Sequence, residues 1–454
     1  MKLRAWQKSC VKAAFDFYQS QKHFFCLATP ASGKTIMSAM LAKQLKEAKL
    51  IDFVICFSPS ATVCENMRET FTLITGKRFD GLIGALGDSH TYQSLRTISD
   101  EYLSLLNESR TLVILDEVHH CAGDSIENAN SWGKGILERL KENATYTLSL
   151  SGTPWRSDCL PITLAHYSDN ITCHFQYGLR EAISDGVCRT PHIVLIDNKN
   201  IKVIKHNEDE LTFPSFIDLF KQKLINYSEL IHHYTALNFI LKKANLKLQA
   251  LRKHDPSSAG LIVASSTSHA YMLQRLMKDE LNQHAVVVTY KNTDALQIIN
   301  QFKISQVPWI ISVGMISEGT DIPRLQVCCH LSRVKTELYF RQILGRVLRV
   351  TNNINDNAWL YTFAEPNLSD FAHRLQEEIP EQSILTYFNV TSEKDLTENK
   401  GKNLPKKLSD RVDGIDLILF HEFENSPNNS DCQMRLNKME LIGGFREKII
   451  ATFS

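Results

Sequence analysis

The chain has 454 residues, of which 43% are hydrophobic and 22% are charged, and its formal net charge is +1. This length and balance predict a globular protein of roughly two to four domains and exclude a disordered or strongly basic chain. A polyanion would have to be held by a local groove, backbone amides and hydroxyls, because no overall positive charge attracts it.

The cysteines and the apolar runs predict a cytoplasmic protein. Eleven cysteines are scattered along the chain without any CxxC pair, which is typical of a reducing compartment. The sequence has no signal-peptide pattern and no apolar run of about 18 residues, so neither secretion nor a membrane partner is expected.

Strand-like and helix-like segments alternate in the first third of the chain. Such alternation predicts a parallel sheet with helices on both faces. The expected strands lie at 24–27, 52–58, 81–86, 111–116 and 146–151, and the expected helices include 61–73 and 132–141.

The same alternation restarts after residue 257, which predicts a second α/β unit. Its expected strands lie at 260–265, 285–290, 309–315, 326–331 and 359–363, and its helices at 268–281, 293–304 and 336–348. We expect a first domain at 1–190, a linker and helical bridge at 191–256, a second domain at 257–375 and a C-terminal extension at 376–454.

Residues 28–35, with the sequence ATPASGKT, join the first expected strand to a helix. In this context backbone N–H groups and the helix N-terminus face an anion. Lys34 would reach the β- and γ-phosphates of a nucleoside triphosphate, and the Thr35 hydroxyl would bind Mg²⁺. The loop is poor in glycine, because Ala28 and Ala31 stand where glycines are common. The alternative is a strand–turn–helix with a solvated lysine.

Two acids, Asp116 and Glu117, end the strand at 111–116. In a phosphate-loop enzyme an acid at this place holds Mg²⁺, and its neighbour can activate the attacking water. Two exposed carboxylates at a turn are the alternative. The position of the pair, after further strands that follow Lys34, favours the catalytic interpretation.

Hydroxyl side chains follow the next expected strand, in the sequence SGTP at 151–154. Ser151 and Thr153 can link the nucleotide site to a neighbouring site by hydrogen bonds. Serine, glycine, threonine and proline also favour tight turns, and that remains the alternative.

The segment 341–349, with the sequence RQILGRVLR, predicts an amphipathic helix. Gln342, Gly345, Arg346 and Arg349 are spaced by three and four residues and would share one face. Two arginines beside a glycine suit contact with a triphosphate that belongs to another domain. An arginine finger of this kind raises the hydrolysis rate by about 10³–10⁵. The alternative is a solvated basic face.

With these segments in this order, the chain resembles superfamily 2 helicases and translocases, in the branch shared by XPB-like helicases and the motor subunits of restriction enzymes. The resemblance covers about residues 1–375. It rests on LRAWQ at 3–7, ATPASGKT at 28–35, FSPS at 57–60, TYQSL at 91–95, DEVH at 116–119, SGTP at 151–154, VASS at 263–266, GMISEGTDIP at 314–323 and QILGRVLR at 342–349.

The resemblance implies two tandem RecA-like domains with parallel sheets and a DExH-type ATPase site between them. It implies catalytic roles for Lys34, Asp116, Glu117, Gln342, Arg346 and Arg349. ATP contacts would come from Arg4, Gln7, Ala31, Ser32, Gly33, Lys34, Thr35, Gly319 and Asp321, with Gln7 on the base and Asp321 on the ribose. The nucleic-acid backbone would meet Ser58, Thr91, Ser265 and Thr320, and His119, Ser151 and Thr153 would couple the two sites.

The leading hypothesis is an ATP-dependent DNA helicase or translocase that uses ATP and Mg²⁺, with Thr35 and Asp116 as the metal ligands. Other protein subunits would bind through the C-terminal extension, in a defence or restriction-type assembly with an antiviral role. An RNA helicase is the alternative within motors, and a nucleic-acid-gated ATPase switch that clamps without unwinding is an alternative of another class.

Overall fold

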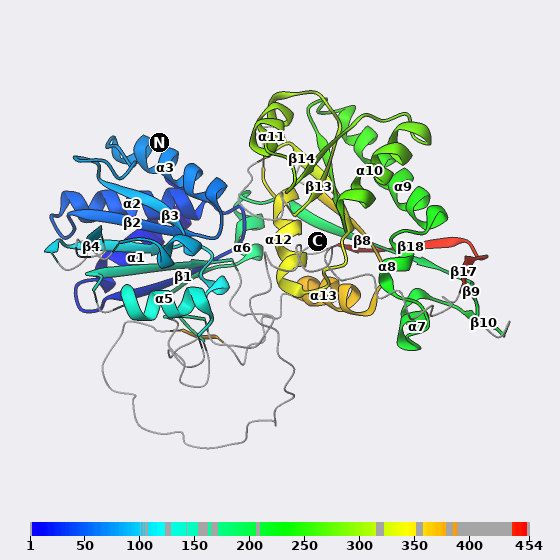
Figure 1. Cartoon of the computed structure of the whole chain (residues 1–454), viewed down its shortest axis with the longest axis horizontal. Helices are drawn as coiled ribbons and strands as arrows, with labels where there is room; N and C mark the ends of the chain where they lie inside the picture. Colours follow the sequence, from blue (N-terminus) through cyan, green and yellow to red (C-terminus); the bar gives the residue numbers. More distant parts are fainter. Residues whose placement is uncertain are drawn as a thin grey trace, which may run out of the picture.

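The computed structural model of the chain describes residues 2–99, 101–102, 104, 108–122, 129–141, 143–152, 162–164, 171–205, 209–314, 322–350, 357–377, 385–387 and 438–451. Figure 1 shows two lobes, the first built from the blue and cyan part of the chain and the second from the green and yellow part. Each lobe has a central sheet with helices around it.

The first lobe contains a six-stranded sheet whose strands are all parallel, in the order β3-β2-β4-β5-β1-β7. The strands are β1 (His23–Ala28), β2 (Phe53–Ser58), β3 (Gly87–Thr91), β4 (Thr111–Leu115), β5 (Tyr146–Ser151) and β7 (Phe175–Tyr177). The helices are α1 (Ala5–Phe17), α2 (Lys34–Glu47), α3 (Ala61–Thr75), α5 (Ser131–Arg139) and α6 (Leu179–Ser184), with the 3₁₀ turns η1 (Tyr92–Arg96) and η2 (Val118–His120).

Both faces of this sheet are buried, which explains the nearly continuous apolar strands. In β1 the side chains of Phe24, Cys26 and Ala28 belong to the core under α1, α2 and α3. Phe25 and Leu27 belong to the opposite core, under η1 and α5. The alternation follows from the two-residue period of a strand.

The second lobe contains a seven-stranded sheet in the order β12-β13-β11-β14-β15-β8-β18, in which only β18 is antiparallel to its neighbour. The strands are β8 (Thr190–Asn198), β11 (Ala259–Ala264), β12 (Ala285–Thr289), β13 (Trp309–Val313), β14 (Leu325–Leu331), β15 (Asn357–Phe363) and β18 (Phe445–Ala451). The helices are α7 (Phe216–Lys221), α8 (Tyr227–Leu230), α9 (Tyr234–Arg252), α10 (Thr267–Asp279), α11 (Ala295–Ile304), α12 (Glu337–Val347) and α13 (Pro366–Glu377).

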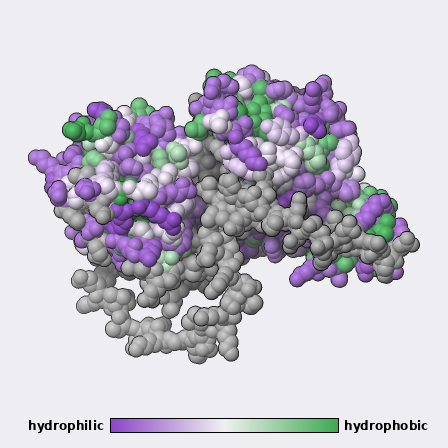
Figure 2. All heavy atoms as spheres, viewed as in Figure 1, coloured by the Kyte–Doolittle hydropathy of each residue, from purple (hydrophilic) through white to green (hydrophobic). Residues whose placement is uncertain are grey.

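Two small sheets complete the described part of the chain. One is antiparallel and contains β10 (Glu210–Phe213), β9 (Ile201–Ile204) and β17 (Lys438–Leu441). The other pairs β16 (Leu385–Tyr387) with β6 (Ile171–Cys173) in parallel. The face of the molecule in Figure 2 is mainly hydrophilic, as expected when the apolar strands fill the cores.

The expected α/β class with two parallel-sheet units is confirmed, but the sheet topology corrects the expected bridge at 191–256. The strand β8 pairs with β15 from Asn357↔Thr190 to Phe363↔Ile196, so it is part of the second sheet. The helix α9 packs against β11, β14 and β15 of that sheet. The expected extension at 376–454 also contributes, because its strand β18 pairs with β8. These pairings join strands that are distant in sequence, which no local pattern reveals.

Candidate nucleotide site at the junction of the two lobes

The loop between β1 and α2 has the backbone geometry of an anion site. Gly33 caps the N-terminus of α2 with a φ of +97°, and Ala31 has a φ of +68°. A left-handed alanine costs about 1–2 kcal/mol, which explains why glycine is common at this position. The Ser32 hydroxyl is fully buried and has no hydrogen-bond partner among the described residues. A polar atom of this kind, beside the free N–H groups of a helix N-terminus, suits a phosphate.

Arg4 and Gln7, at the start of α1, hold the backbone of this loop. The Arg4 guanidinium donates from Nη1 to the Ser32 carbonyl at 2.8 Å, and Gln7 Nε2 donates to the Gly33 carbonyl at 3.0 Å. The Arg4 amide donates to Gln7 Oε1 at 2.9 Å, which fixes the side-chain amide of the glutamine. The contact of Gln7 with a nucleotide base stays a prediction, whereas its contact with the loop is direct.

Lys34, the first residue of α2, forms an ion pair with Glu117, which lies just after β4. The Lys34 ammonium lies 3.1 Å from Glu117 Oε1 and donates to the Ala28 carbonyl at 3.1 Å. Burial raises the pKa of the Glu117 carboxyl, but Lys34, His119 and His120 outweigh burial, and the pKa lies at about 2. Glu117 is therefore an ionised acceptor, and its Oε2 also accepts from the Gly152 amide at 3.2 Å.

Asp116 and Thr35 are the predicted magnesium ligands, and both lie at the carboxyl edge of the first sheet. Asp116 follows β4 directly and is mostly buried, while Thr35 is the second residue of α2. The strands β4, β5 and β1 are neighbours, so their carboxyl ends lie together. Carboxylate and hydroxyl oxygens are ligands that Mg²⁺ accepts, and the donor set fits the ion.

His119 and Ser151, two of the predicted coupling residues, contact each other. The imidazole Nδ1 of His119 lies 2.9 Å from the Ser151 hydroxyl and 3.4 Å from Glu117 Oε2. This contact joins η2, which follows the acid pair, to the end of β5. The third predicted coupling residue, Thr153, lies outside the described residues, as do Gly319, Thr320 and Asp321.

The second lobe meets the loop through α12, which carries three of the four residues predicted to share a basic face. Pro30 lies between Gly152 and Gly345 and is close to both backbones. If Gly345 carried a Cβ atom, that atom would lie 2.7 Å from the Pro30 Cβ, and a Cβ atom on Gly152 would lie 3.1 Å from the Pro30 ring. Gln342 and Arg346 are partly buried residues of the same helix. The basic helix and the phosphate-loop candidate are therefore neighbours.

Arg349 does not continue this helix, which corrects the expected helical face. The helix ends at Val347, and Arg349 forms an antiparallel bridge with Cys188. Burial raises the pKa of the Cys188 thiol to about 12, and the charges of Arg4, Arg349 and Lys34 act against that rise. All three cations therefore lie near this thiol, whose Sγ is 3.7 Å from the Pro30 carbonyl.

Sequence reasoning missed Arg189, which precedes β8 directly. Its side chain is 1% exposed, and its Nη1 donates to the carbonyls of Leu325 at 2.8 Å and Val347 at 3.1 Å. Its amide donates to the Leu348 carbonyl at 2.7 Å. The only signal in the sequence is a single arginine before an apolar run, which ordinarily indicates a solvated strand end.

The predicted nucleic-acid contacts are only partly accessible. Ser58 is fully buried, and its hydroxyl lies 3.5 Å from Met67 Sδ, so its contact with nucleic acid stays a prediction. Thr91 ends β3 and is partly exposed. Ser265 follows β11, and its hydroxyl lies 2.8 Å from His269 Nδ1.

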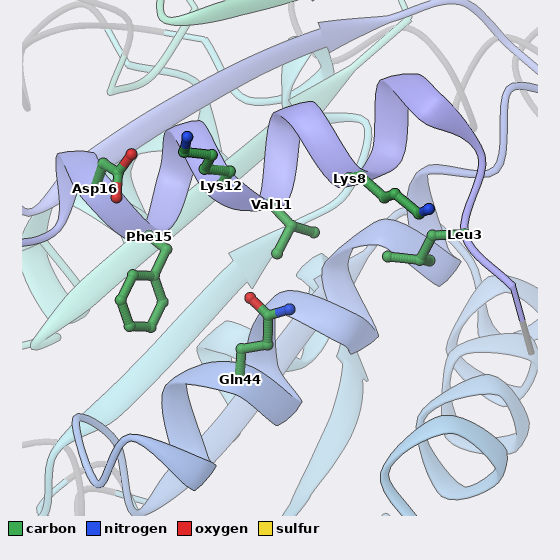
Figure 3. Close-up of a pocket in the computed structure, with 7 residues that line it drawn as sticks. All are labelled: Leu3, Lys8, Val11, Lys12, Phe15, Asp16 and Gln44. Carbon is green, nitrogen blue, oxygen red and sulfur yellow. The ribbon is translucent and has the colours of Figure 1, made fainter.

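A shallow pocket lies between α1 and α2, apart from this site. Figure 3 shows Gln44 of α2 pointing toward Val11, while Leu3 and Lys8 lie near the start of α1. None of its lining residues belongs to the loop at 29–33, to the acid pair or to α12. We therefore assign the candidate nucleotide site to the junction of the lobes.

Comparison with known protein families supports the two-lobe organisation. Residues 1–156 match the family described as type III restriction enzyme, res subunit, and residues 242–351 match the helicase conserved C-terminal domain. An uncharacterized protein of Mycobacterium leprae is 27% identical over 409 residues, which cover 83% of this chain and 64% of that protein. The chain thus spans less than two thirds of that relative. The DNA 3′-5′ translocase XPB2 of Sulfurisphaera tokodaii is 22% identical over 385 residues, covering 77% of this chain and 79% of XPB2.

Solved structures share the fold at low identity. A fragment assigned to an HsdR subunit of a type I restriction enzyme from Vibrio vulnificus YJ016 has a TM-score of 0.57 at 16% identity, covering 85% of this chain and 68% of that one. The type ISP restriction-modification enzyme LlaBIII bound to DNA has a TM-score of 0.55 at 14% identity, covering 87% of this chain and 32% of LlaBIII. Dbp5 of S. cerevisiae bound to RNA and ADP BeF3 has a TM-score of 0.51 at 12% identity, covering 85% and 90%. No helix in the described part of the chain is long and apolar enough to cross a membrane.

Proposed function

Because the chain belongs to helicase superfamily 2, we propose that it is an ATP-dependent DNA helicase or translocase that hydrolyses ATP between its two lobes. The observation that carries the proposal is the contact of Pro30 with Gly345. It brings the anion-binding loop of the first lobe against the helix of the second lobe that carries Arg346. A nucleotide held by the loop would be reached from both sides.

In the proposed mechanism the triphosphate is bound by the loop amides and the N-terminus of α2. Lys34 leaves Glu117 for the phosphates, which removes the main charge that lowers the pKa of the Glu117 carboxyl and makes it a stronger base. The freed carboxylate orients the attacking water. Thr35 and Asp116 would hold Mg²⁺, which neutralises charge on the phosphates when it is bound. Arg346 and Arg349 stabilise the charge that develops on the transferred phosphoryl group.

Movement would follow from closing and opening of the junction. Each lobe supplies half of the nucleotide contacts, so binding favours the closed arrangement and hydrolysis releases it. The His119–Ser151 contact lies beside Glu117, where it would report the state of the nucleotide to the rest of the first lobe. Contacts to the nucleic-acid backbone suit a motor that must pass any sequence, and the proposed ones are Ser58, Thr91, Ser265 and Thr320.

DNA is favoured as the track because the relative XPB2 is named a DNA 3′-5′ translocase and LlaBIII was solved on DNA. The test is the ATPase rate with single- and double-stranded DNA and RNA, together with strand-displacement and triplex-displacement assays. Stimulation by DNA with triplex displacement supports a translocase. Stimulation by RNA alone would identify RNA, and not DNA, as the track. An RNA helicase is the second candidate because the structurally similar Dbp5 was solved bound to RNA. Stimulation without any displacement would support a clamping ATPase switch.

A restriction-type or antiviral assembly is the proposed setting, with other subunits bound through 376–454. The support is the match of residues 1–156 to the res-subunit family. Reconstitution tests it: the chain alone should move on DNA without choosing a target. Full targeted activity of the isolated chain would contradict a need for partners.

A further inference from the structure

A single buried arginine, Arg189, occupies the place where the chain crosses from the first lobe to the second. It lies between α6, the last helix of the first lobe, and β8, which belongs to the second sheet. In addition to the carbonyls of Leu325 and Val347, its guanidinium donates to the Pro323 carbonyl, from Nη1 and Nη2 at 3.2 Å each. One side chain therefore joins the start of β14 to the end of α12.

The acceptors on α12 are its last carbonyls, which have no partner within the helix. A cation at a helix C-terminus is stabilised by these carbonyls and by the negative end of the helix dipole. Arg189 caps the end of α12, because its guanidinium donates to the Val347 carbonyl and its backbone amide donates to the Leu348 carbonyl. The chain leaves the helix at this point, and Arg349 pairs with Cys188.

The neighbouring residue, Cys188, contacts the first lobe. Its Sγ lies 3.7 Å from the Pro30 carbonyl, and its backbone pairs with Arg349. Two consecutive residues thus touch the loop that would hold phosphate and the end of the helix that precedes Arg349. These two contacts link Arg349 to that loop through Cys188.

We infer that Arg189 is a positioning residue for ATP hydrolysis: by capping α12, it holds Arg349 at the loop without touching the nucleotide itself. The inference rests on the proposed function. It predicts a loss of kcat with little change in the KM for ATP, because the loop and Lys34 still bind the substrate. Arg189 acts through Arg349, so its effect should disappear when the Arg349 side chain is already absent.

The test is a double-mutant cycle on the full chain with Arg189→Met, Arg349→Ala and both together. We expect Arg189→Met to lower kcat at least about tenfold with KM within about threefold, and to lower it less than about twofold further in the Arg349→Ala background. Arg189→Lys keeps the charge but cannot reach the same carbonyls at once, so it should restore only part of kcat. If the fold-losses of kcat from the two single substitutions multiply in the double variant, the two residues act independently and the inference is overturned.

Arg324 provides a matched control, because it is another buried arginine of the second lobe that donates to carbonyls. Its guanidinium donates to the carbonyls of Phe302, Ser257 and Val307, none of which belongs to α12. Its chain neighbours Pro323 and Leu325 carry the carbonyls that Arg189 binds, so the control lies in the same segment. Arg324→Met should lower the melting temperature as Arg189→Met does but keep kcat in the folded protein. An equal kcat loss in both, or failure of both Arg189 variants to fold, would make Arg189 merely structural and overturn the inference. If Arg349→Ala itself left hydrolysis unchanged, the proposed function would fail instead.

Discussion

Pro30 and Gly345 lie so close that no side chain fits between the loop and α12: a Cβ atom on Gly345 would sit 2.7 Å from the Pro30 Cβ. Pro30 belongs to the loop of the first lobe and Gly345 to a helix of the second. The glycine therefore sets how closely α12 approaches the candidate nucleotide site.

Gly345→Ala should push α12 away from the loop and lower the ATPase rate. Arginine-finger contacts are worth about 10³–10⁵ in rate, so even a partial displacement should cost about tenfold or more in kcat. Steady-state ATPase kinetics measure the effect. Gly444→Ala is the control, because a Cβ there meets nothing within 4 Å. Equal rates in the Gly345 variant and wild type would show that the close approach has no catalytic role.

Glu117→Gln should lower hydrolysis by about 10²–10⁴, the usual contribution of a general base. ATP binding should persist, since Lys34 loses only the carboxylate that it pairs with at 3.1 Å. Fluorescent-nucleotide binding and single-turnover hydrolysis separate the two effects. Glu138→Gln, an exposed glutamate on α5, should change neither. Loss of binding together with hydrolysis would argue that Glu117 has a structural role.

Ser151→Ala should weaken the response to nucleic acid more than the basal ATPase rate. The variant removes the hydroxyl that lies 2.9 Å from His119 Nδ1 and leaves the acid pair in place. The measurement is the ratio of ATPase rates with and without DNA. Ser305→Ala, at the end of α11 in the second lobe, is the comparison. An unchanged ratio in Ser151→Ala would remove this contact from the coupling path.

His330 should make the protein less stable as the pH falls from 7 to 5. Burial lowers the pKa of His330 to about 4, and neither ring nitrogen has a hydrogen-bond partner among the described residues. Because the folded pKa is depressed, its stabilising effect is complete above about pH 6.5 and is lost as the pH falls toward 4. Between pH 7 and 5 the loss is about 2 kcal/mol.

Urea unfolding of His330→Leu checks this prediction. The variant should lose about 2 kcal/mol less than wild type between pH 7 and 5, since leucine does not titrate. His254→Gln, at an exposed position after α9, should keep the wild-type slope. Identical slopes in wild type and His330→Leu would show that another group carries the acid sensitivity.

The local parts of the site were predictable from the sequence, and the non-local parts were not. The strand, loop and helix around Lys34 follow from the spacing of apolar residues and from the small residues of the loop. The spacing also predicts α12 to within one residue at each end. Its spacing predicts Arg349 on that helix, but the helix ends at Val347, where Arg189 from a distant segment donates to the Val347 and Leu348 carbonyls. The same reason explains β8, whose place in the second sheet is set by its pairing with β15.

The binding of one nucleotide by both lobes is tested most directly by DNA-stimulated ATP hydrolysis in wild type, Lys34→Ala and Arg349→Ala. Lys34→Ala should abolish hydrolysis, and Arg349→Ala should lower kcat by about 10³ while circular dichroism and melting stay near wild type. Wild-type rates in Arg349→Ala would contradict binding by both lobes, because the second lobe would then contribute nothing to the reaction.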